Sequence, residues 1–237
     1  MLKFFGRGAG FSDEHNSACF SMREKLVIMD CPLVTFNRLK KDVSVGENYN
    51  EITALITHTH SDHIGGLSLM IHYARFIWKI KITVVAPSEE VKENLAYMLT
   101  YLDGCSKDAY SLVTAEEYMT HEENSWLKAV IPTTHVPELE GKCFGYNISV
   151  DGTNTVYTGD TNTLEPFIPY LTEESELYTE CSAYDTKVHM YVEKLLGYEE
   201  YFRSKHIKVY LMHLDDAGRI EKIVKDTDYK IAPLLQK

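Results

Sequence analysis

Short apolar runs, most of them rich in β-branched residues, alternate along the chain with segments whose apolar residues recur three or four positions apart. Apolar runs bounded by turn residues are typical of buried strands, and the wider spacing is typical of amphipathic helices. Strands interleaved with helices predict an α/β protein. The expected strands cover residues 1–6, 17–22, 25–30, 52–57, 82–86, 113–120, 126–131, 143–150, 155–157, 177–180 and 207–212. The expected helices cover residues 33–40, a segment that begins near 62, 88–101, 165–171, 187–196, 199–205 and 218–224.

Local turn and capping residues support several of these boundaries. Arg23-Glu24 and Asp151-Gly152 each separate two expected strands, as the turns of β-hairpins do. Ser88 lies at the start of an expected helix, where a side-chain oxygen can cap the first turn. No internal repeat, low-complexity run or linker interrupts the 237 residues, so we expect a single domain, residues 1–237.

Composition narrows the class of protein. Hydrophobic residues make up 44% of the chain, enough for a large core, but no apolar run reaches the roughly 18 residues of a membrane span. The N-terminal segment is too short and too polar for a secretory signal. The five cysteines form no Cys-x-x-Cys pair and leave one odd, which indicates reduced thiols rather than a disulfide framework. We therefore expect a cytoplasmic protein without a membrane partner.

The balance of charge bears on the size of the substrate. The 24 basic and 35 acidic side chains give a formal net charge of −11. Such a charge repels a long polyanion over a broad surface, whereas a small anion meets only its own binding site. The charge therefore favours a small substrate over a long nucleic acid.

Candidate chemistry is concentrated between residues 55 and 66, at the junction of a buried strand and a helix. His58 and His60 lie two positions apart at the end of the strand, where extended backbone points both side chains the same way. Asp62 and His63 follow in the turn, and two glycines after them let the helix backbone approach closely. Imidazole nitrogens and a carboxylate are suitable ligands for Zn²⁺ and other divalent first-row ions. The stretch therefore predicts a metal site.

Three more residues of the ligand type lie at the ends of expected strands farther along the chain. They are His135, Asp160 and His213. Each follows an apolar run, at a point where an α/β sandwich presents side chains along one edge of its sheets. This repeated placement, rather than any one of the residues, suggests that all three join the same site.

His-x-His-x-Asp-His after a buried strand resembles the signature of the metallo-β-lactamase fold superfamily. The resemblance implies a four-layered αββα sandwich and two divalent metal ions, with zinc as the first expectation and manganese as the second. Two adjacent ions lower the pKa of a shared water to near neutrality and so supply hydroxide. By the same resemblance, one ion is held by His58, His60 and His135, the second by Asp62, His63 and His213, and both are bridged by Asp160.

Other residues are similar to the ribonuclease Z-like branch of this superfamily. Asn16-Ser17, before a strand pair that ends in Asp30-Cys31, resembles the opening of its members. His189 matches the histidine that protonates the leaving oxygen in that branch. Glu180 matches the glutamate that orients this histidine, although only the Glu of the branch's His-Glu-Ala-Thr segment is present. The resemblance therefore implies three catalytic residues, Asp62, Glu180 and His189.

One departure from ribonuclease Z bears on the substrate. That enzyme grips transfer RNA with a long flexible arm inserted between its third histidine ligand and its bridging aspartate, whereas residues 136–159 leave room here only for a hairpin. The chain resembles instead the compact phosphodiesterases of the branch, which include enzymes that open cyclic nucleotides, among them anti-Pycsar enzymes of phages. We therefore expect a dinuclear metal-dependent phosphodiesterase that hydrolyses a small nucleotide ester, a cyclic nucleotide above all. The resemblance also implies a homodimer.

Other functions stay open from the sequence. The same site could serve tRNA 3′ processing or the hydrolysis of a lactone or thioester, but a His189–Glu180 pair favours phosphodiesters over those carbonyl substrates. Di-iron members of the superfamily reduce oxygen or nitric oxide alongside a flavin domain, for which this chain has no room. A protein that binds metal without turnover is the last alternative, and a complete ligand set with a candidate acid argues against it.

Overall fold

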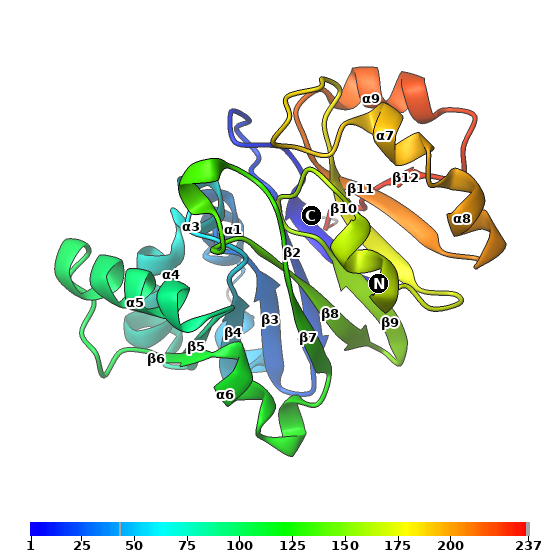
Figure 1. Cartoon of the computed structure of the whole chain (residues 1–237). Helices are drawn as coiled ribbons and strands as arrows, with labels where there is room; N and C mark the ends of the chain where they lie inside the picture. Colours follow the sequence, from blue (N-terminus) through cyan, green and yellow to red (C-terminus); the bar gives the residue numbers. More distant parts are fainter. Residues whose placement is uncertain (43, 236–237) are drawn as a thin grey trace.

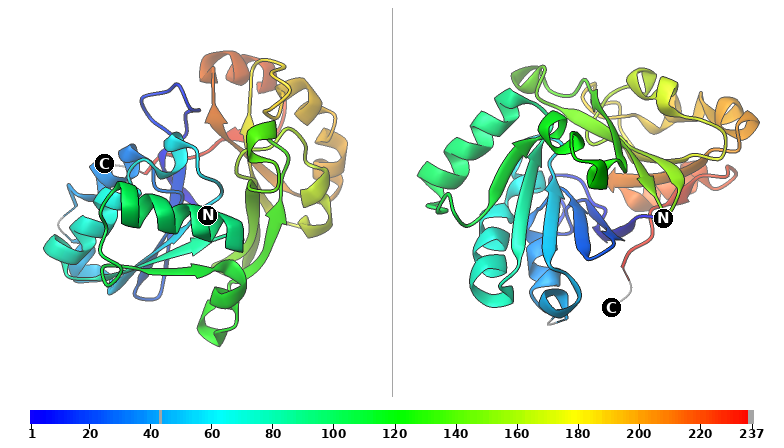
Figure 2. Two further views of the ribbon diagram at one scale, coloured as in Figure 1. Left: turned by 60° about the vertical axis from the view of Figure 1, so that its left-hand side comes forward. Right: turned by 90° about the horizontal axis from the view of Figure 1, so that it is seen from below.

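Two six-stranded β-sheets pack face to face at the centre of the protein, and helices cover their outer faces (Figure 1). This computed structural model describes residues 1–42 and 44–235. Figure 2 shows the helices of the N-terminal half on one side of the sheets and those of the C-terminal part on the other. The expected four-layered αββα sandwich is confirmed. The single domain over residues 1–237 stays a prediction, and its residues 43 and 236–237 lie outside the described ones.

The two sheets share one plan, in which three antiparallel strands are extended by parallel ones. In the first sheet β1 to β3 are antiparallel and β4 to β6 follow in parallel, and in the second β7 to β9 are antiparallel and β10 to β12 follow in parallel. The first sheet consists of β1 (Lys3–Gly6), β2 (Ser17–Met22), β3 (Lys25–Met29), β4 (Glu51–Leu55), β5 (Lys81–Ala86) and β6 (Ser111–Thr114). The second consists of β7 (Leu127–Pro132), β8 (Phe144–Val150), β9 (Thr153–Tyr157), β10 (Glu176–Cys181), β11 (Lys208–Leu214) and β12 (Lys230–Ile231).

Helices connect the parallel strands. As expected, the Ser88 hydroxyl caps α5 (Glu89–Tyr97) by accepting a hydrogen bond from the Val91 N–H at 3.3 Å. The π-helical turns η1 (Ala74–Trp78) and η2 (Met98–Leu102) extend α4 and α5. The other α-helices are α1 (Leu33–Leu39), α2 (Val45–Asn48), α3 (Ser61–Ile64), α4 (Leu67–Tyr73), α6 (Ala115–Met119), α7 (Val192–Leu196), α8 (Glu199–Ser204) and α9 (Ala217–Val224). The short 3₁₀ turns are η3 (Glu122–Asn124), η4 (Pro137–Leu139) and η5 (Glu165–Tyr170).

Both faces of each sheet are buried. Between the sheets, Val27 and Leu55 of the first pack in one cluster with Tyr146 and Tyr178 of the second. A further apolar cluster lies between each sheet and the helices that cover it, one for the first sheet and one for the second. Burial on both faces explains why the parallel strands are continuous apolar runs rather than alternating ones. It also holds the ends of these strands in fixed positions, and the loops that carry the expected metal ligands begin there.

The structure corrects the expected elements at several points. Residues 113–120 are not one strand, because β6 ends at Thr114 and α6 begins there with a capping box. The helix expected over residues 187–196 begins only at Val192, so His189 lies in the loop before α7. The segment 165–171 forms a 3₁₀ turn, η5, that contains two prolines. Two short elements, α2 and β12, were not expected from the pattern.

Among the described residues, no helix is both long and apolar enough to cross a membrane. All five cysteines are buried and none is in a disulfide, as the odd count suggested.

Candidate metal centre

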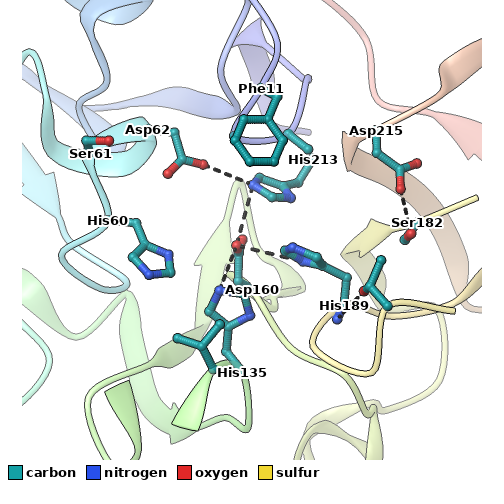
Figure 3. A pocket seen from close by; sticks show the side chains of 14 residues that line it. Phe11, His60, Ser61, Asp62, His135, Asp160, Ser182, His189, His213 and Asp215 are labelled. Atoms are coloured by element: carbon teal, nitrogen blue, oxygen red, sulfur yellow. Dashed lines mark hydrogen bonds and ion pairs between the residues drawn. The ribbon is translucent and has the colours of Figure 1, made fainter. Parts of the chain in front are cut away.

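Loops at one edge of the two sheets bring the seven predicted ligands together. From the first sheet, the loop after β4 carries His58 and His60, and α3 carries Asp62 and His63. From the second sheet, His135 and Asp160 follow β7 and β9, and His213 lies near the end of β11. Figure 3 shows five of these side chains, His60, Asp62, His135, Asp160 and His213, around a common point.

His58, His60, His135 and Asp160 form a first cluster, in which one donor atom from each lies within 4.8 Å of the others. The Nε2 of His58 lies 3.0 Å from the Nδ1 of His60. The Oδ2 of Asp160 lies 3.9 Å from the Nε2 of His58 and 3.6 Å from the Nε2 of His135. Burial lowers the pKa of all three histidines, which favours neutral imidazoles with free lone pairs. Three neutral imidazoles and a carboxylate suit a divalent ion.

Asp62, His63 and His213 form a second cluster. The Oδ2 of Asp62 lies 3.4 Å from the Nε2 of His63 and 3.3 Å from the Nε2 of His213. Asp160 reaches this cluster as well, because its Oδ1 lies 3.4 Å from the Nε2 of His63 and its Oδ2 lies 3.4 Å from the Nε2 of His213. One carboxylate therefore lies between two groups of nitrogen donors.

Local backbone irregularities place two of these residues. The pairing of β10 with β11 shifts register after Glu180, which leaves His213 as an extra residue with a φ of 50°. Such a bulge re-aims a side chain that would otherwise alternate across the sheet. Asp160 follows Gly159, whose φ is +60° and whose added Cβ would lie 2.6 Å from the Phe144 carbonyl oxygen. Only glycine fits that turn, and the turn carries Asp160 into the site.

The polar atoms at the centre are arranged for a cation. The Nε2 of His63 and the Oδ1 of Asp160 are buried, and neither has a hydrogen-bond partner among the described residues. Burial alone would raise the pKa of Asp160, but the charges of His213 and His63 hold it well below its usual range. Against the effect of burial, Asp160 in turn raises the pKa of His63 and His213. The negative field that favours protons on these imidazoles equally favours a divalent metal ion, so the donor set fits one.

Outer contacts fix which nitrogen faces the centre for three of the histidines, His58, His63 and His135. The Nδ1 of His63 lies 2.8 Å from the Oδ2 of Asp30, and the Nδ1 of His135 donates to the Val188 carbonyl oxygen at 2.8 Å. The Thr57 hydroxyl donates to Asp30 and lies 3.0 Å from the Nδ1 of His58, so it can accept the proton of that nitrogen. In each case Nδ1 is engaged on the outside and Nε2 is left for a ligand, as around protein-bound metals.

The structure pairs His189 with Glu180 beside the two clusters. The Nδ1 of His189 lies 2.7 Å from the Oε2 of Glu180 and 4.0 Å from the Oδ2 of Asp160. The other carboxylate oxygen of Glu180 accepts a hydrogen bond from the Thr161 N–H, so this buried side chain is held at both oxygens. Burial lowers the pKa of His189, but the hydrogen bond and charge of Glu180 outweigh it and raise the pKa to about 9.

These residues line a cavity of about 390 Å³ (Figure 3). Its wall includes His189 and five of the expected ligands together with loop residues such as Phe11 and Asp215. A volume of this size lies within the range of about 300–1,000 Å³ that is usual for small-molecule sites.

Sequence reasoning did not find two parts of the site. The sequence indicates Asp30 only as part of an opening that resembles the ribonuclease Z-like branch, whereas its carboxylate accepts hydrogen bonds from the Thr57 N–H and hydroxyl and from His63. Its φ of 60°, uncommon for an aspartate, could not be inferred from the pattern. Asp215 lines the cavity and accepts hydrogen bonds from the Ser182 hydroxyl and the Ala183 N–H. The only available signal was its position two residues after His213.

Solved structures with this fold cover nearly the whole chain. The metallo-β-lactamase fold protein YhfI from Bacillus subtilis has a TM-score of 0.74 and 17% identity, with 98% of this chain and 96% of that chain covered. The short form of human tRNase Z has a TM-score of 0.66 and 15% identity, with 99% and 97% covered. At these identities the likeness shows the metallo-β-lactamase fold alone.

Sequence comparisons are more specific. The Anti-Pycsar protein Apyc1 of Bacillus phage BSP38 is 30% identical over 235 residues, which cover 91% of this chain and 89% of the relative. The protein of the same name in Bacillus phage 010DV004 is 31% identical over 178 residues, which cover 68% of each chain. Residues 1–232 match the family model described as Anti-Pycsar protein Apyc1. Because that match spans nearly the whole chain, this protein belongs to the Anti-Pycsar protein Apyc1 family.

Proposed function

We propose that the protein is a metal-dependent phosphodiesterase that hydrolyses a cyclic nucleotide, and that one domain, residues 1–237, carries this activity. The observation that supports the proposal best is the shared carboxylate of Asp160, which lies between two groups of metal-type donors. Such an arrangement suits two divalent ions that act on one phosphodiester. Membership of an anti-Pycsar family agrees with a small cyclic nucleotide as substrate.

The residues that would hold the metal are those of the two clusters. His58, His60 and His135 would hold one ion, Asp62, His63 and His213 the other, and Asp160 would contact both. Divalent ions such as zinc or manganese, when bound, supply Lewis acidity and acidify a water molecule. The catalytic role of Asp62 would be exerted through the ion of its own cluster, since its carboxylate lies 3.3 Å from the Nε2 of His213 and 3.4 Å from the Nε2 of His63, where the ion would be held.

His189 would deliver the proton that the leaving oxygen needs. Opening a cyclic phosphodiester expels an alkoxide, which leaves readily only if it is protonated. The pKa of about 9 keeps His189 protonated at neutral pH, and nearby metal cations would move this pKa down towards neutrality. Glu180 orients the ring through its hydrogen bond to Nδ1 and leaves Nε2 as the nitrogen that can donate. A thioester expels a thiolate, a much weaker base, and so has less need of such an acid.

The size of the cavity favours a mononucleotide over a long RNA. A volume of about 390 Å³ suits a small ligand, and the β8–β9 hairpin fills the connection in which ribonuclease Z carries its RNA-binding arm. The net charge of −11 adds repulsion for a polyanion. The homodimer implied by the resemblance stays part of this proposal.

The test compares substrates of different size on metal-loaded protein. A panel of 3′,5′-cyclic nucleotides and a tRNA precursor should be assayed at the same moderate salt concentration, because weak RNA binding depends strongly on salt. We expect kcat/KM for at least one cyclic nucleotide to exceed that for the precursor. Accurate cleavage of the precursor with no turnover of cyclic nucleotides would instead identify a tRNA-processing enzyme.

A further inference from the structure

A loop between β1 and β2 lies against the metal centre and is firmly attached there. The Ala9 N–H donates to the Leu214 carbonyl oxygen at 3.0 Å, and the Leu214 N–H donates to the Arg7 carbonyl oxygen at 2.7 Å. This strand-like pairing joins the loop to β11 directly beside His213. The loop closes on itself through the Gly8 N–H, which donates to the Glu14 carbonyl oxygen at 2.8 Å. Its backbone is therefore held in place rather than free.

The tip of this loop reaches the ligands of the second cluster. The Ser12 N–H donates to the Ala9 carbonyl oxygen at 2.9 Å, which makes a turn with Gly10 and Phe11 at its two central positions. A Cβ added to Gly10 would lie 3.2 Å from the Oδ2 of Asp62, so the backbone passes very close to that carboxylate. The next residue, Phe11, is thereby placed at the wall of the cavity.

Phe11 is fully exposed to solvent on this well-anchored turn. Figure 3 shows its ring beside Asp62 and His213. An exposed phenylalanine gains nothing from the hydrophobic effect, because its ring stays in water until something covers it. Among the described residues that line the cavity, it is the only phenylalanine, tyrosine or tryptophan.

The rest of the wall explains what could cover this ring. Carboxylates of Asp62, Asp160 and Asp215 line the cavity and would repel a phosphate unless metal ions were present to hold it. A nucleobase is neutral and flat, and these carboxylates offer it no apolar surface. The face of the Phe11 ring is a flat apolar surface that can accept it.

We propose that Phe11 stacks on the nucleobase of the substrate and so makes a binding site for the base next to the metal centre. This inference rests on the proposed function, since it needs a nucleotide whose phosphate lies at the two clusters. Every base has a π-face, so stacking adds affinity without selecting one base over another. Gly10 then has a role, because it lets the turn pass close enough to Asp62 to present the ring. Gly8 lets the loop close on itself, because an added Cβ would collide with Ser12.

The test separates the base from the phosphodiester. The substrates are four 3′,5′-cyclic nucleotides, two purine and two pyrimidine, and the base-free methyl riboside 3,5-cyclic phosphate. For Phe11→Ala we expect KM to rise about 10- to 100-fold on all four nucleotides, the range that corresponds to loss of one base stack. The rise on the base-free analogue should be at least about tenfold smaller. Phe11→Trp should keep KM for the nucleotides close to that of the wild type.

A matched control replaces another exposed phenylalanine, Phe76 in η1, with alanine. Phe76→Ala should change KM for none of the five substrates. An equal effect of Phe11→Ala on nucleotides and on the base-free analogue, or no effect on either, would overturn the inference and leave the proposed function intact. If the wild-type protein hydrolyses none of the five diesters, the proposed function fails and the inference fails with it. Because Phe11 is exposed, its variants should keep the melting temperature of the wild type, which checks their fold.

Discussion

The Nδ1 of His63 lies 2.8 Å from the Oδ2 of Asp30, and both side chains are completely buried. Asp30 follows β3, whereas His63 lies in α3, after the loop that follows β4. The same carboxylate accepts a hydrogen bond from the Thr57 N–H at 2.8 Å, where that loop begins. One buried side chain therefore holds both ends of the segment that carries four of the seven expected ligands.

Asp30→Asn should weaken metal binding although residue 30 is not itself an expected ligand. The amide cannot accept the His63 proton as strongly, so the imidazole loses its preferred orientation. Changes to such outer partners usually lower metal affinity about 10- to 100-fold. Competition with a chromophoric chelator would measure the effect. Asp108→Asn, an exposed acid paired with Arg75, is the control and should bind metal as the wild type does.

Asp160→Ala should lose metal from both clusters. The wild type is expected to hold about two divalent ions per chain, since each cluster offers enough donors for one. Asp160 contributes to both, so its removal should lower the metal content by more than one equivalent in elemental analysis. A wild-type protein that binds no metal after reconstitution would contradict the proposed function as a whole.

Chelation of the metal should lower thermal stability. A ligand present at about 100 times its Kd stabilises the native state by about 2.7 kcal/mol. For a chain of this length, that corresponds to a fall in Tm of about 5–10 °C when the metal is removed. Scanning calorimetry with and without chelator measures it. An unchanged Tm would mean that the clusters hold little metal under those conditions.

His189→Ala should affect substrates according to their leaving group. We expect turnover of cyclic nucleotides to fall about 10²–10⁴-fold, the usual contribution of a general acid. A nitrophenyl diester should lose much less, because nitrophenolate leaves without a proton. In the wild type, the step that needs this proton should slow as pH rises through the pKa of His189, which is about 9 without metal and lower beside bound cations. Equal losses on both substrates would assign His189 another role, and exposed His121→Ala serves as control.

The cysteine thiols should be unreactive in the native protein. Burial raises the pKa of Cys19 and Cys143 to about 12 and raises those of Cys31, Cys105 and Cys181 as well. Reaction with a disulfide reagent requires the thiolate, so little colour should develop at pH 8 within minutes. All five thiols should react after denaturation. Rapid reaction of any thiol in the native protein would show that its burial is incomplete.

The sequence predicted best what is local. His58, His60, Asp62 and His63 lie within one loop and its helix, so their spacing alone was enough to place them together. The pairing of Asp30 with His63 and of Glu180 with His189 depends on how separate elements pack, and no spacing reveals it. Here the resemblance to a family was needed, and it supplied the pair Glu180–His189 but not the role of Asp30. The structure brings all these residues together, while their functions stay predictions.

The error at residues 113–120 has a different cause. Val113, Tyr118 and Thr120 favour strands by propensity, and they hid a helix signal that was present. Thr114 and Glu117 form a capping box, in which the Glu117 N–H donates to the Thr114 hydroxyl at 3.1 Å and the Thr114 N–H donates to the Glu117 carboxylate at 2.7 Å. The apolar spacing continues backwards from Val192 to Val188 and so predicts a helix across His189, where the structure has a loop.

The uneven distribution of the expected ligands along the chain has a consequence for the unfolded state. Four of them lie within residues 58–63 and stay close together even when no tertiary structure exists. The other three, His135, Asp160 and His213, approach only after the second sheet has formed. An unfolded chain therefore keeps a partial chelating site of its own. Metal bound there offsets part of the stabilisation that the complete centre provides, because only the difference between native and unfolded affinities counts. Refolding with metal present from the start should thus load the loop first and complete the coordination last.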